Sequence, residues 1–144
     1  MKKKMLFGSV VLFAISLCLS TVAVAAPNMQ EGTWEIKAEM KMEGMPFPMP
    51  PVQYSQCLTK KDMVPHQKEK NKDCTMVSQK VVGDTVTWVM KCEDKKGGKT
   101  ESSGNLTYKG KSFDGKIHTV STDAHGAKSE MNMIMSGRRT GDCK

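Results

Sequence analysis

Hydrophobic and charged side chains alternate one by one through residues 31–42. The apolar positions are Trp34, Ile36, Ala38, Met40 and Met42, and Glu35, Lys37, Glu39 and Lys41 stand between them. A repeat of two residues matches a β-strand, on which successive side chains point to opposite faces. The segment therefore predicts a strand with one buried face and one face in water.

The next part of the chain changes character several times. Residues 44–51 hold four prolines among glycine and methionine, so they can form neither a helix nor a fully paired strand. Residues 52–58 predict a second strand. Residues 59–64 predict one short helical turn, with Thr59 as N-cap and Asp62 three positions later. The polar and charged residues 65–73 predict a loop.

From Cys74 onward the pattern is one of β-hairpins. Segments 75–82 and 85–92 flank Gly83-Asp84, segments 99–109 and 112–121 flank Gly110-Lys111, and segment 127–136 follows a turn at His125-Gly126. Strands separated by such short turns are typical of antiparallel sheets. We predict an all-β fold: an antiparallel meander of six to seven strands with one short helical turn. It would curl into a barrel or half-barrel, with a sandwich as the alternative.

The N-terminus carries the pattern of a secretory signal peptide. Lys2, Lys3 and Lys4 precede an apolar run over 5–19, and Ala23 and Ala25 occupy the small-residue positions of a cleavage site after Ala25. The apolar run is too short for a convincing membrane span. We therefore expect residues 1–25 to be a cleaved signal peptide, and residues 26–144 to be a single exported domain that does not span a membrane.

Charge and side-chain chemistry narrow the functional classes. Without the three leader lysines, 19 basic residues face 15 acidic ones, so the net charge falls from +7 to about +4. This mild excess specifies no partner, and the lack of a basic-aromatic pattern argues against nucleic acid. His66, His118 and His125 lack the spacing of a ligand pair, and we expect them to be solvated. No nucleophile motif is present. The sequence therefore predicts no enzyme and no cofactor.

Four cysteines remain after the leader: Cys57, Cys74, Cys92 and Cys143. An even number in a small exported domain favours two disulfides. Cys74 and Cys92 lie nine residues either side of Gly83, so a hairpin centred there would bring them within bonding reach. We favour Cys74–Cys92, with Cys57–Cys143 by elimination, among the three possible connectivities.

The face pattern of this hairpin conflicts with that pairing. A two-residue turn at Gly83-Asp84 pairs Val81 with Val86 and Val77 with Met90, and it points the two cysteines to opposite faces. A bulge near Cys74 would reconcile the register with the disulfide.

Six short motifs occur in a familiar order. They are Glu31-Gly32-Thr33-Trp34-Glu35, residues 44–51, Gln56-Cys57-Leu58-Thr59, Val86-Thr87-Trp88 leading to Cys92, residues 108–113 and residues 137–143. Together they resemble the bacterial exported proteins of domain-of-unknown-function family 3617, over essentially the whole mature chain. The resemblance implies a small periplasmic β domain from a Gram-negative bacterium, and it implies no activity.

Methionine is the unusual chemical resource of this chain, with eleven left after the leader. Met131, Met133 and Met135 alternate on one predicted strand and so project from one face. Methionines on a half-buried strand are most often core filler, because the side chain adapts to irregular gaps. They can also form the flexible wall of an apolar ligand site. Their thioethers can instead bind soft ions such as Cu(I) or Ag(I).

The leading hypothesis is a binding or structural module whose curved sheet holds an apolar or lipid-like molecule, or contacts the cell envelope. The residues expected on the concave side are Trp34, Met40, Trp88, Met90, Met133 and Met135. The alternative is a soft-metal site formed by Met40, Met42, Met45 and Met49. Arg138 and Arg139, flanked by Gly137 and Gly141, could grip an anion or protect an exposed sheet edge, and we favour the edge.

Overall fold

Seven β-strands make up a computed structural model of the chain, which describes residues 26–42, 44, 47, 49–66 and 70–144. The strands are β1 (Gly32–Met42), β2 (Val52–Leu58), β3 (Lys72–Val82), β4 (Thr85–Asp94), β5 (Lys99–Tyr108), β6 (Ser112–Thr122) and β7 (Lys128–Gly141). The predicted signal peptide lies outside the described residues. Within those residues, no helix is long and apolar enough to cross a bilayer.

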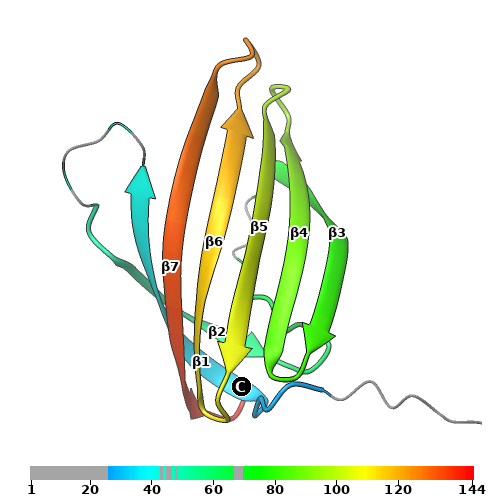
Figure 1. Cartoon of the computed structure of the whole chain (residues 1–144), viewed down its shortest axis with the longest axis vertical. Helices are drawn as coiled ribbons and strands as arrows, with labels where there is room; N and C mark the ends of the chain where they lie inside the picture. The colour runs from blue at the N-terminus through cyan, green and yellow to red at the C-terminus, as the bar shows by residue number, and fades with distance from the viewer. Residues whose placement is uncertain (1–25, 43, 45–46, 48, 67–69) are drawn as a thin grey trace, which may run out of the picture.

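All seven strands belong to one antiparallel sheet with the order β2-β1-β7-β6-β5-β4-β3. Strands β3 to β7 form a meander, whereas β1 pairs with β7 and carries β2 on its other side (Figure 1). The sheet curls into a half-barrel whose two outer strands are β2 and β3. The predicted all-β fold and half-barrel are confirmed, and the single sheet excludes the sandwich.

The hydrophobic core fills one end of the concave face. Trp34, Tyr108 and Phe113 come from β1, β5 and β6, and all three side chains are buried. Their ring centroids lie 5.4 to 5.8 Å apart, in edge-on and tilted contacts that aromatic rings favour. Met29 packs into the same cluster from the N-terminal side. We call this the closed end of the half-barrel.

Two glycines on the concave face make room for aromatic rings. A Cβ on Gly104 would stand 2.7 Å from the Trp88 ring, and a Cβ on Gly137 would stand 2.1 Å from the Phe113 ring. Each ring therefore packs directly against bare backbone of a neighbouring strand. This close approach is what lets the sheet curl tightly around its core.

Residues 59–66, which we call the strap, leave β2 and run under the concave face. The predicted helical turn is wrong. The Thr59 and Asp62 backbones instead form a reciprocal pair, with the Thr59 amide donating to the Asp62 carbonyl at 3.3 Å and the Asp62 amide donating back at 3.0 Å. Met63 and Val64 then enter the core at 8% and 2% exposure. Burial of these side chains outweighs one turn of helix, which is weak on its own.

The β3–β4 hairpin contains the expected bulge. Val81 pairs with Val86, as the two-residue turn predicts, but the register shifts between Met76 and Ser78, which leaves Val77 unpaired. The predicted pairing of Val77 with Met90 is therefore wrong, because Met76 takes that place. The shift puts Cys74 directly opposite Cys92.

Two disulfides follow the favoured pairing. Cys74 and Cys92 are joined with their Cα atoms 4.0 Å apart, and Cys57 and Cys143 with their Cα atoms 5.4 Å apart. The second bond ties β2 to the chain just beyond β7.

The two neighbouring arginines do not protect an exposed edge. They belong to β7, which lies between β1 and β6 and is paired on both sides. Arg138 contacts Glu35 at 3.3 Å, and the Arg139 Nε atom donates to the Glu31 carbonyl at 2.7 Å. Arg139 also pairs with Asp142. Both guanidinium groups therefore fasten neighbouring parts of this chain to β7.

Candidate functional site

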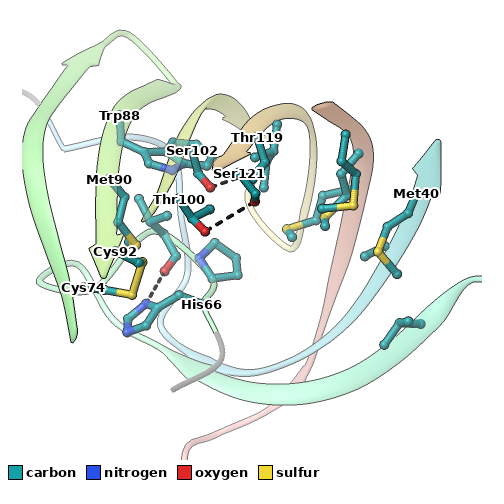
Figure 2. Close-up of a pocket in the computed structure, with 18 of the residues that line it drawn as sticks. Met40, His66, Cys74, Trp88, Met90, Cys92, Thr100, Ser102, Thr119 and Ser121 are labelled. Atoms are coloured by element: carbon teal, nitrogen blue, oxygen red, sulfur yellow. Dashed lines mark hydrogen bonds between the residues drawn. A yellow bond between two sulfur atoms is a disulfide. The ribbon is translucent and has the colours of Figure 1, made fainter. Parts of the chain in front are cut away.

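The concave face is not filled along its whole length. Beyond the closed end lies a cavity of about 400 Å³, bounded by the strands and by the strap. Figure 2 shows the labelled side chains of Trp88, Met90 and Met40 turned into this space from β4 and β1. Alternation along each strand explains the arrangement, since every second residue of a curled strand must face inward.

One wall of the cavity consists of methionines on β1 and β7. Met131, Met133 and Met135 share the inward face of β7, and Met40 lies beside them on β1. The register places Met40 opposite Met133 and Ala38 opposite Met135. Met135 is buried, whereas Met40, Met131 and Met133 are half-buried. This wall is therefore apolar and flexible.

The facing wall comes from β3 and β4. Trp88 is 2% exposed and forms the deep part of this wall. Met90 and the Cys74–Cys92 disulfide follow toward the open end (Figure 2). Sulfur and indole surfaces bind apolar groups through dispersion and burial, with few directional contacts. The bulge at Val77 matters here, because it is what turns Cys74 inward.

Paired hydroxyl groups lie between the two apolar walls. Ser102 and Thr119 approach each other at 3.0 Å, and Thr100 and Ser121 at 3.3 Å, across β5 and β6. Thr119 is only 8% exposed. In each pair one hydroxyl donates to the other, so the accepting hydroxyl can still donate its own proton, and both oxygens keep capacity to accept a hydrogen bond. A ligand with a hydroxyl, ester or carboxyl group would find partners along this row.

The strap and β2 close the cavity from below. Val64, Pro65 and His66 line it, together with Tyr54 of β2. His66 is less solvated than predicted: it lines the cavity, 30% of its side chain is exposed, and its Nδ1 atom donates to the Val64 carbonyl at 3.0 Å. Burial raises the pKa of Tyr54 above its ordinary value.

Five of the six residues predicted for the ligand site line the cavity: Met40, Trp88, Met90, Met133 and Met135. Trp34 does not. It has the same facing but lies at the closed end, where it is fully buried against Tyr108 and Phe113 and its Nε1 atom donates to the Gln30 carbonyl at 3.2 Å. Facing alone does not fix how far along the half-barrel a side chain lies, and for this reason the prediction failed.

Three of the four methionines of the soft-metal alternative, Met40, Met42 and Met49, belong to the described residues. Met40 and Met42 share the inward face of β1, and Met49 is half-buried just before β2. Met45 lies outside the described residues. Met40 and Met42 lie opposite two methionines of β7, Met133 and Met131.

The hydroxyl row is the feature that the sequence interpretation missed. The row could have been predicted from the Gly110-Lys111 turn, because a hairpin with this turn pairs Ser102 with Thr119 and Thr100 with Ser121, as observed. Small polar residues at four inward positions were a detectable exception to the apolar pattern.

His118 lies on the opposite, convex face of the sheet, as predicted. Its Nδ1 atom contacts the Asn132 side-chain oxygen at 3.0 Å, and 44% of its side chain is exposed. In the part of the chain that the structure describes, no three or more His, Cys, Asp or Glu side chains are grouped to hold a metal ion.

Comparison with known protein families identifies the family of this chain. The model of a family described as "Protein of unknown function (DUF3617)" matches residues 29–143. No curated protein and no solved structure matches the chain.

Proposed function

Because the chain belongs to the DUF3617 family, whose function is unknown, we propose a function from its own cavity: it is an exported, non-catalytic protein whose half-barrel binds one apolar or lipid-like molecule. Contact with an envelope component is the related role for the same face.

The observation that carries this proposal is the unfilled half of the concave face. A protein interior is normally packed to the density of an organic crystal, so a sheet that only needed a core would close over it. Here a space of about 400 Å³ stays open between two apolar walls. Its volume lies in the lower part of the range for small-molecule sites, which is about 300 to 1,000 Å³.

The lining favours an amphiphile with one chain. Methylene groups against the methionine wall and Trp88 would each gain about 0.8 kcal/mol from burial. The hydroxyl row from Thr100 to Ser121 would accept or donate hydrogen bonds to a polar group on the same molecule. A volume at the lower end of the usual range favours a single chain over a two-chain lipid.

Export is supported by the leader pattern at residues 1–25 and by the disulfides, which persist in oxidising compartments. The mature protein from a Gram-negative host should be found in the periplasmic fraction. Its mass should equal that of a chain that begins at Ala26, less four hydrogens for the two disulfides. Recovery of an uncleaved chain from the cytoplasm would contradict export.

Binding is tested with undecanoic acid carrying a dansyl group, whose fluorescence rises in an apolar site. The wild-type protein should bind one molecule saturably. Thr100→Trp places a large ring in the cavity and should abolish that binding. Glu101→Trp is the matched control, because the next residue on β5 is exposed and does not line the cavity.

Both variants carry the same added indole, so their fluorescence backgrounds are alike. Loss of binding in Thr100→Trp with retention in Glu101→Trp would support the cavity as the site. Equal binding by the two variants, or no saturable binding by the wild type, would overturn the proposal. Circular dichroism of each variant checks that the sheet has formed.

A further inference from the structure

Two pairs of methionines face each other across β1 and β7. The register places Met40 opposite Met133 and Met42 opposite Met131, and all four side chains belong to the inward face of the sheet. We call these four residues the methionine quartet. Three of them, Met40, Met131 and Met133, line the open part of the cavity.

Core packing accounts for only part of this cluster. Met135 is buried in the core, and Met133 packs against it. Met40, Met42 and Met131 are half-buried and are not among the described side chains that pack against the core. Three flexible, oxidisable side chains therefore stand together at a partly solvated position, where a leucine or valine would cover the sheet equally well.

The dimensions of the sheet allow the four sulfur atoms to converge. The Cβ atoms of directly opposite residues on antiparallel strands lie about 4.5–5.5 Å apart. Residues two apart on one strand are separated by roughly 6.6 Å, at about 3.3 Å per residue. A methionine side chain has three rotatable bonds, so each sulfur can reach toward the centre of this rectangle. Metal–sulfur bonds are roughly 2.3 Å long, judged by the zinc–thiolate value.

The chemistry of the ligands selects the ion. Thioethers are neutral and polarisable, so they favour soft ions of low charge such as Cu(I), whereas magnesium, calcium and manganese favour oxygen ligands. Among the described residues, no group of three or more His, Cys, Asp or Glu competes for a metal. The four cysteines within the described residues form disulfides and offer no thiolate.

We propose that the methionine quartet is a binding site for a soft monovalent cation, Cu(I) or Ag(I), formed by Met40 and Met42 of β1 and Met131 and Met133 of β7. The site is distinct from the one that the sequence suggested, because the two β7 methionines replace Met45 and Met49. It lies at the open end of the apolar cavity, and it does not depend on that cavity holding a lipid-like molecule.

The test uses the full mature protein with Cu(I), kept reduced under anaerobic ascorbate, in competition with the chromophoric chelator bicinchoninate. We expect one ion per chain. The double variant Met40→Leu/Met133→Leu keeps the apolar surface and removes one thioether from each strand. Since even indirect partners of a metal are worth about 10- to 100-fold in affinity, we expect a loss of roughly 100-fold or more.

Met90→Leu is the control variant. Met90 lines the same cavity from β4 on the facing wall, so its loss should change the Cu(I) affinity less than about twofold. Equal affinities for the wild type and Met40→Leu/Met133→Leu would overturn the proposal. So would an equally large loss in Met90→Leu, because the ion would then bind elsewhere in the cavity.

A second readout locates the ion directly. In the proton–carbon NMR spectrum of the methionine methyl groups, one equivalent of Ag(I) should shift the four quartet signals and leave those of the core residues Met29 and Met63 in place. Movement of signals outside the quartet alone would contradict the assignment. The dansyl-undecanoate assay on the leucine variants keeps the two proposals separate. A variant that binds the probe but not Cu(I) has lost the metal site alone. A variant that binds Cu(I) but not the probe has lost the apolar site alone.

Discussion

The hydroxyl of Tyr108 donates a hydrogen bond to the backbone carbonyl of Met63, which lies 45 residues earlier in the chain. The bond is buried, and it fixes the strap to the last residue of β5 beneath the core. Because the strap also forms the lower boundary of the cavity through Val64 and His66, this contact connects the stability of the closed end to the shape of the site.

Replacing Tyr108 with phenylalanine should therefore destabilise the protein more than removal of a hydroxyl that makes no hydrogen bond within the chain. The ring and its packing against Trp34 remain, but the Met63 carbonyl loses its partner, at a cost of about 1–3 kcal/mol. Urea unfolding measures the change. Tyr54→Phe is the control, because the half-buried Tyr54 hydroxyl has no hydrogen-bond partner among the described residues; the variant should change the free energy of unfolding by less than about 0.5 kcal/mol. Equal effects of the two variants would show that the strap is not held by this bond.

The same tyrosine predicts sensitivity to alkali. Burial, and secondly the negative charge of Asp62, raise the pKa of Tyr108 well above its ordinary value of 10.0. In the unfolded chain the phenol ionises near pH 10, whereas in the folded protein it stays protonated. The stabilising contribution is therefore complete below about pH 10 and is lost as the pH rises above it, by up to about 1.4 kcal/mol per pH unit.

The measurement is the free energy of unfolding of the wild type minus that of Tyr108→Phe, from about pH 9 to pH 11. Other groups that titrate in this range, Tyr54 included, are present in both proteins and largely cancel in the difference. The advantage of the wild type should shrink as the pH rises. A constant difference would mean that Tyr108 ionises alike in both states.

The glycine beneath Phe113 should tolerate no side chain. A Cβ on Gly137 would stand 2.1 Å from the Phe113 ring, whereas a Cβ on Gly141 of the same strand would have no heavy atom within 4 Å. We expect Gly137→Ala to lose about 1–3 kcal/mol through overpacking, and Gly141→Ala to change little. Thermal unfolding of both variants tests this, and a similar melting temperature for the two would contradict the observed contact.

The two disulfides should contribute unequally. They close loops with sequence separations of 18 for Cys74–Cys92 and 86 for Cys57–Cys143. In the chain-entropy description these loops correspond to about 3 and about 4.5 kcal/mol. Cys57→Ala/Cys143→Ala should therefore be less stable in urea than Cys74→Ala/Cys92→Ala. The reverse order would indicate that wall packing around Cys74 outweighs the loop term.

Local patterns predicted most of the sheet. Alternation placed β1, and the Gly83-Asp84 and Gly110-Lys111 turns placed four strands with nearly their observed bounds. The pairing of β1 with β7 was not predictable in this way, because it joins the two ends of the domain and no turn specifies it. The bulge was anticipated from the cysteines, but its position at Val77 was not, because no local sequence signal marks that residue.

The sequence predicted which side chains lie on the concave face, but not how far along the half-barrel each one lies. Met40, Trp88 and Met133 were assigned to the concave face, and they line the cavity. Trp34 shares that facing but lies in the core, because the closed end is defined by side chains from distant strands. The strap also reached the cavity unpredicted, since Met63 and Val64 gain more from burial than the predicted helical turn would have given.

The disulfides have a mechanical consequence for the half-barrel. Each of its two outer strands contains one bonded cysteine, Cys57 on β2 and Cys74 on β3. Cys57 is bonded to Cys143, just beyond the end of β7, and Cys74 is bonded to Cys92 on the neighbouring strand β4. Outer strands are where an open sheet normally frays and where foreign strands add. Both outer strands are therefore held to the rest of the chain by a covalent bond. In a reducing solution we expect β2 and β3 to detach from the sheet first, and the aromatic cluster of Trp34, Tyr108 and Phe113 to stay folded longest.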